Sequence, residues 1–174
     1  MVRLDTLLDS WKTVRRDTAQ AVEDFPAAEL DFKPTPEMDS FRQIALHVLN
    51  AGNGLTGVML EGEETLMGPE FREKMKKYFA TLPADADAAA LAAELRAAVD
   101  RKAVELAQKT PEWYAQIITR VDGQKVTRQE MLQFVKEHEL THRAQLFVYL
   151  RLKGLVPATT RRRLAMQAKP AAKG

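Results

Sequence analysis

An unbroken helical pattern over residues 127–153, which contain neither proline nor glycine, constrains the fold most strongly. Thr127 followed by Glu130 makes a capping-box sequence at its start, and Gly154 supplies a stop at its end. Inward positions recur along it in steps of three and four, which average to the period of an α-helix. These inward positions hold Met131, Val135, His138, His142, Leu146 and Tyr149. We therefore predict one long helix that carries two histidines on its inward face.

Three further helices are predicted before this one, over residues 4–25, 39–58 and 84–110, because apolar residues recur there at helical spacing. Asp39 or Ser40 would cap the second of them. The connection between the second and third helices is long and includes a short helix at residues 71–80. Almost no strand signal is present apart from a small hairpin around Asp122 and Gly123, just before the last helix. The pattern predicts an all-α four-helix bundle.

Three glycines interrupt the second predicted helix, at Gly52, Gly54 and Gly57. Each costs about 0.5 to 1 kcal/mol relative to alanine in a helix interior. Two readings are open. The helix frays early into the following loop, or the small residues leave room beside His47 for a ligand.

Composition limits the classes of protein to consider. With 174 residues and 45% hydrophobic content, one domain is expected, over residues 1–157. The absence of cysteine excludes disulfides, zinc–cysteine clusters and a thiol nucleophile, and is compatible with a reducing cytoplasm. Asp5 and Asp9 interrupt any signal-peptide core, and no segment has the length of a membrane span. We expect a cytoplasmic protein without a membrane partner.

A basic segment ends the chain, and we expect residues 158–174 to be a flexible tail. It carries Arg161, Arg162, Arg163, Lys169 and Lys173 and no acid. Nucleic-acid binding through these cations would be weak and salt-sensitive, and no aromatic residues are interleaved to stack bases. Nucleic acid is therefore not the expected partner.

The string from His138 to His142 spells HExxH, the pattern of a zinc-protease helix. A protease of that kind needs a third ligand after the helix. Gln145 and Val148 stand where the extended motif has glycine and histidine, and residues 143–174 contain no Asp, Glu or His. The protease reading is therefore rejected.

The three histidines of the chain nevertheless indicate a metal site. Several unpaired imidazoles in an apolar core would be costly, whereas one shared cation would satisfy them all. His47 is the only histidine upstream of the pair and faces inward from the second helix, so the predicted ligands are His47, His138 and His142. Three histidines leave one position open, as in catalytic zinc sites. Zinc or nickel is favoured, although iron or manganese would also accept imidazole.

The segment from His138 to Gln145, with Tyr149 and Gly154 after it, resembles the last helix of the DinB-like superfamily. The spaced prolines of residues 30–41, followed by Ile44, Ala45 and His47, are similar to the family's approach to its second helix. The resemblance covers residues 2–157. It implies an up-down-down-up bundle, the same three metal ligands and frequently a homodimer. Relatives include thiol-dependent S-transferases and a mycothiol-dependent isomerase, so a low-molecular-weight thiol is a possible cosubstrate.

The roles of the neighbouring residues stay open at this point. Glu139 could act as a general base, but it lies about 100° from the histidine stripe, which favours a surface acid. Arg143 and Gln145 are candidates to orient the ligands from outside the first coordination sphere. An imidazole N–H could be held by one of four acids: Asp9, Asp17, Glu94 or Glu105.

Two functions from different classes follow. The first is a metal-dependent enzyme acting on small molecules, either a thiol-dependent S-transferase or a hydrolase. The alternative is a stress-associated binding or interaction protein without enzymatic activity, in which the metal is structural.

Overall fold

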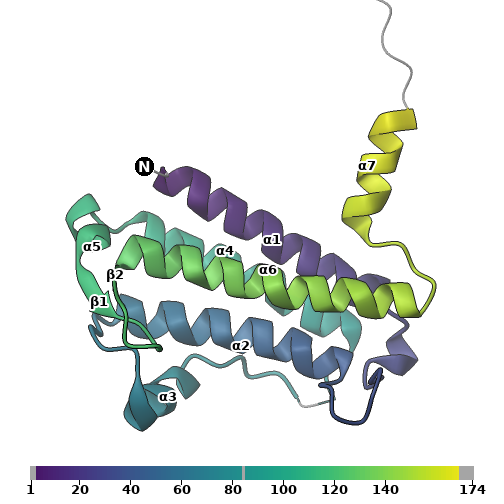
Figure 1. Ribbon diagram of the computed structural model, residues 1–174, viewed down its shortest axis with the longest axis horizontal. Helices are drawn as coiled ribbons and strands as arrows, with labels where there is room; N and C mark the ends of the chain where they lie inside the picture. Colours follow the sequence, from purple (N-terminus) through teal and green to yellow (C-terminus); the bar gives the residue numbers. More distant parts are fainter. Residues whose placement is uncertain (1–2, 84, 169–174) are drawn as a thin grey trace, which may run out of the picture.

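Four long helices form a bundle in the computed structural model, which describes residues 3–83 and 85–168 (Figure 1). They are α1 (Leu4–Asp24), α2 (Phe41–Leu60), α4 (Ala88–Ala107) and α6 (Arg128–Leu152). Helices α1 and α6 run in one direction and α2 and α4 in the other, so the predicted up-down-down-up bundle is confirmed (Figure 1). Each of α1 and α2 packs against both α4 and α6.

Shorter elements connect the four helices, and one more helix follows the last of them. They are η1 (Ala27–Glu29), α3 (Gly68–Lys76), α5 (Pro111–Ala115), β1 (Ile117–Thr119), β2 (Lys125–Thr127) and α7 (Ala158–Ala168). Strands β1 and β2 pair antiparallel, which confirms the predicted hairpin before the last helix. The single turn of α5 was not predicted; Thr110 caps it and Pro111 occupies its first position. Among the described residues, none of the helices combines the length and apolar character needed to cross a membrane.

Local capping sequences set the helix ends. Ser40 forms a capping box with Gln43 at the start of α2, and Thr127 forms one with Glu130 at the start of α6. Gly154 has φ of 73°, the left-handed conformation that ends a helix without strain in glycine. Ser40, Thr127 and Gly154 thus act as the sequence predicts.

Two apolar clusters make up the core of the bundle. One gathers around Phe25 and Phe41, whose rings stack with centroids 3.8 Å apart, and the other around Trp11. Between them lies a layer with two buried charged side chains, Arg15 of α1 and Glu139 of α6. This polar layer interrupts the core near the middle of the bundle.

The glycines of α2 serve neither of the predicted purposes. The helix continues to Leu60 without fraying early. A Cβ at Gly52 would collide with the guanidinium of Arg15, and one at Gly57 would collide with the ring of Tyr78. These glycines therefore leave space for side chains from other parts of the chain, Arg15 of α1 and Tyr78 after α3. The sequence of α2 alone does not reveal this need for space.

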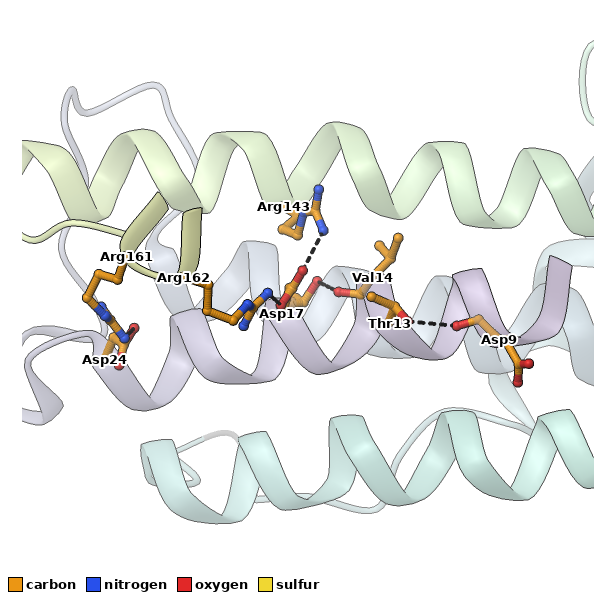
Figure 2. A network of polar contacts seen from close by, with 9 residues as sticks. Asp9, Thr13, Val14, Asp17, Asp24, Arg143, Arg161 and Arg162 are labelled. Atoms are coloured by element: carbon orange, nitrogen blue, oxygen red, sulfur yellow. Dashed lines mark hydrogen bonds and ion pairs between the residues drawn. The ribbon is translucent and has the colours of Figure 1, made fainter. Parts of the chain in front are cut away.

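The predicted flexible tail includes α7, which turns away from the bundle (Figure 1). Figure 2 shows how α7 meets α1: Arg161 pairs with Asp24 at 2.7 Å, and Arg162 pairs with Asp17. Asp17 also accepts a bond of 3.2 Å from Arg143 of α6. The predicted tail contacts the bundle through charges, and Lys169 and Lys173 lie outside the described residues.

Replacing Arg161 and Arg162 with alanine is expected to lower the free energy of unfolding by about 1 kcal/mol or less, because solvent screens ion pairs whose arginine side chains are 48% and 57% exposed. Urea unfolding at low salt would measure the difference, and roughly 1 M NaCl should remove it by screening. A loss above about 2 kcal/mol that persists in high salt would contradict this prediction.

Candidate metal centre

His47 of α2 meets His138 and His142 of α6 at the seam between the two helices. Nε2 of His138 lies 3.1 Å from Nε2 of His47 and 3.1 Å from Nε2 of His142. One ligand atom from each histidine can be chosen so that all three lie within 4.8 Å of one another. One turn of helix separates His138 from His142, which brings the two rings to the same face. The structure thus brings together the three histidines that the sequence singles out.

The spacing of the three nitrogens suits a metal ion. Two nitrogens at zinc–nitrogen distances of about 2.0–2.1 Å and tetrahedral angles lie about 3.3–3.4 Å apart, close to the spacing found here. Three neutral imidazoles offer three lone pairs and no charge, a donor set that zinc, nickel and iron accept. The geometry and chemistry of the cluster therefore fit one divalent ion.

The cluster is more open than the sequence predicts. His47 is exposed, and His138 and His142 are partly buried, although all three were expected to face the interior. The other inward positions of α6, among them Val135 and Leu146, are buried as predicted. The cause is the position of the cluster at the outer edge of the contact between α2 and α6, because Gln43, one turn before His47, and Gln145, one turn after His142, are exposed as well.

Gln145 and Arg143 have different roles in the structure. Oε1 of Gln145 lies 2.8 Å from Nδ1 of His142 and can accept a hydrogen bond from a protonated Nδ1. A proton on Nδ1 leaves the lone pair of Nε2 directed into the cluster, the tautomer that a ligand needs. Arg143 pairs instead with Asp17 and ties α6 to α1.

Glu139 is not the surface acid that the sequence favours. Its side chain is 2% exposed and accepts hydrogen bonds from three residues of α1. The donors are Trp11 Nε1 at 3.0 Å, Arg15 Nε at 2.7 Å and Thr18 Oγ1 at 3.2 Å. The expectation fails because α6 packs against both α1 and α2, so a residue 100° from the histidines faces a second helix rather than solvent.

The acids suggested as partners of an imidazole N–H make other contacts. The carboxylate of Asp17 pairs with Arg143 and Arg162, that of Glu94 with Arg101, and that of Glu105 with Lys102. The main-chain carbonyl of Asp9 accepts a bond from Thr13.

Three residues that donate hydrogen bonds to Glu139 were not identified from the sequence as part of the site: Trp11, Arg15 and Thr18. The sequence does carry a signal for Arg15, because this arginine falls on the inward side of a helix whose inward residues are mostly apolar. A buried arginine requires a partner, which the sequence alone does not name.

The pKa values of His47 and His138 are both lowered. Burial is the larger cause for His138 and, with repulsion from His142 and His47, lowers its pKa to about 4. His47 is exposed as a whole residue, but partial desolvation of its ring and then repulsion from His142 lower its pKa, while Asp39 acts in the opposite direction. His138 is therefore neutral, as a metal ligand must be, throughout the physiological range.

The metal-free protein should lose stability on acidification because of His138. Its pKa of about 4 in the folded state lies below the ordinary value near 6.5, so the unfolded chain binds more protons between these values. The free energy of unfolding is expected to rise by about 1–3 kcal/mol from pH 4 to pH 6.5 through this residue, and then to level off. Urea unfolding across this range should show the rise in the wild type and a reduced rise in His138→Gln. If the free energy of unfolding rose equally with pH in the two proteins, the low pKa would not belong to His138.

Comparison with known proteins places the chain in a structural group. A DinB-like protein from Bacillus subtilis has 23% sequence identity over 85% of this chain and 91% of its own, with a TM-score of 0.65. YfiT from Bacillus subtilis, described as a probable metal-dependent hydrolase with an unusual four-helix bundle topology, has 20% identity over 87% and 88%, with a TM-score of 0.67. The mycothiol-dependent maleylpyruvate isomerase has 20% identity over 83% of this chain and 61% of its own, with a TM-score of 0.61.

At these identities the likeness shows a shared fold. No curated protein matches the chain. The family model described as DinB family matches residues 1–172, nearly the whole sequence. With its four-helix bundle and its cluster of three histidines, the chain belongs to the DinB family.

Proposed function

We propose that this protein is a divalent-metal-dependent enzyme that acts on small molecules, with His47, His138 and His142 as the ligands of one ion. The observation that carries the proposal is the convergence of three Nε2 atoms from two helices. Zinc and nickel suit this donor set best. Three protein ligands leave a coordination position free, as in catalytic rather than structural zinc sites.

The reaction is either hydrolysis or S-transfer from a low-molecular-weight thiol. A bound ion of this kind lowers the pKa of water or of a thiol toward neutrality, which generates a nucleophile. The chain has no cysteine, so a thiol would come from a cosubstrate. Support for these two classes comes from the descriptions of two proteins of the same fold, a probable metal-dependent hydrolase and an isomerase that depends on the thiol mycothiol.

The chain's own side chains would hold and expose the reacting centre. Exposure of His47 leaves one side of the cluster open to a small molecule. Gln145 would keep Nε2 of His142 unprotonated. Glu139 is not proposed as the base, since both of its carboxylate oxygens already accept hydrogen bonds from α1.

A structural role of the metal is the second candidate, because an ion at this cluster would join α2 to α6. In that case the protein would bind a partner without catalysing a reaction. Chelation separates the two functions. For a catalytic ion, the chelated protein should retain its helical circular dichroism and unfold cooperatively.

Cobalt(II) loading followed by 2-mercaptoethanol tests the free position directly. A catalytic site should take up the thiol, and the ligand-field absorption bands of cobalt should change. Loss of helical structure on chelation, with absorption bands that the thiol leaves unaltered, would favour the structural role instead.

A further inference from the structure

One arginine of α1 contacts both helices that carry the histidines. Nε of Arg15 donates to Oε1 of Glu139 at 2.7 Å, and Nη2 donates to the carbonyl of Val48 at 3.3 Å. Glu139 directly follows His138 on α6, and Val48 directly follows His47 on α2. Arg15 therefore ties together the chain positions immediately beside two of the three clustered histidines.

Further contacts hold this pair in one orientation. Trp11 donates to Oε2 of Glu139, and Thr18 donates to Oε1, so both carboxylate oxygens are engaged from α1. The side chain of Arg15 is 1% exposed and fits where α2 has Gly52 in place of a larger residue. The two charged groups are thus held by a buried tryptophan and by the backbone of α2.

Stability alone does not account for a buried ion pair at this place. Taking two charges out of water is costly, and well-packed apolar residues often serve the fold as well or better. Among the described residues, Nη1 of Arg15 has no hydrogen-bond partner, which adds to the cost. Apolar clusters lie on both sides of the pair, so an apolar layer would have continued the core.

We propose that Arg15 and Glu139 are positioning residues that set the distance between His47 and His138. This inference rests on the metal centre proposed above. An ion binds tightly only when its ligands are held within about 0.5 Å of the required geometry. Two helices that contact each other through apolar side chains alone can shift by such amounts, whereas a directional ion pair anchored on a third helix resists the shift.

Cobalt(II) binding to the full-length protein tests this inference. The main variant combines Arg15→Met with Glu139→Leu, which replaces the pair by apolar side chains of similar size. Its matched control combines Glu23→Leu with Arg96→Met, which removes an ion pair between α1 and α4. Affinity would be measured by competition with a chelator, coordination by the ligand-field absorption bands, and folding by thermal unfolding.

The main variant should remain folded, bind cobalt about 10–100-fold more weakly and show shifted absorption bands, because displaced supporting groups commonly have effects of this size. The control should match the wild type. Unchanged affinity and bands in the folded main variant would overturn the inference while leaving the metal centre intact. A wild type that binds no ion would overturn the proposed function and the inference with it. If the main variant does not fold, the single variant Glu139→Gln is measured in its place. Weaker binding with shifted bands would then support the inference, and unchanged affinity and bands would overturn it.

Discussion

Glu139→Ala should lower the free energy of unfolding by about 3–5 kcal/mol, the loss expected when one member of a buried ion pair is removed. Arg15, at 1% exposure, would keep its charge without a carboxylate, and the indole N–H of Trp11 would lose its acceptor. Urea unfolding of the metal-free proteins near pH 7 measures the effect without any contribution from bound ions.

Two comparisons isolate the cause of this loss. The double replacement Arg15→Met with Glu139→Leu should cost far less than Glu139→Ala, because it leaves no unpaired charge. Glu23→Ala removes the partner of Arg96 in a partly exposed pair and should cost about 1 kcal/mol or less. If Glu139→Ala were as mild as Glu23→Ala, the buried pair would be unimportant to the fold.

Local patterns explain why most of the fold is predictable from the sequence. The helices follow from the spacing of apolar residues, and their ends follow from Ser40, Thr127 and Gly154, whose effects depend on a few neighbouring residues. The grouping of the histidines is predictable for a different reason. The chain has three histidines, and two of them lie one helical turn apart, so few arrangements remain.

Features that depend on a third helix were not predictable in the same way. Periodicity identifies one inward face of α6, but α6 has neighbours on two sides, so Glu139 is buried although it lies off the histidine stripe. The role of Gly52 is equally hidden, because the side chain that needs the space, Arg15, belongs to α1. Both errors concern the same polar layer, where distant segments meet.

His138→Ala is expected to reduce the bound ion from about one per chain to near zero and to weaken the affinity by more than about 100-fold. The reason is that His138 is the central residue of the cluster, with its Nε2 close to the Nε2 atoms of both other histidines. Such a loss exceeds the 10–100-fold effect that is typical of groups outside the first coordination sphere. Metal analysis of protein purified without a histidine tag, with a chelator competition for the affinity, measures both quantities.

Thr141→Ala is the matched control for His138→Ala, since Thr141 is exposed and lies on the same helical turn between the two histidines of α6. It should retain one ion per chain.

The metal-free His138→Ala protein should also be more resistant to acid than the wild type, because the alanine removes an imidazole whose pKa is lowered to about 4 in the folded state. Loss of the ion without loss of stability near pH 7 would identify His138 as a ligand, because a residue needed mainly for packing would lower the stability when removed. Stoichiometric ion in His138→Ala would show that the metal lies elsewhere.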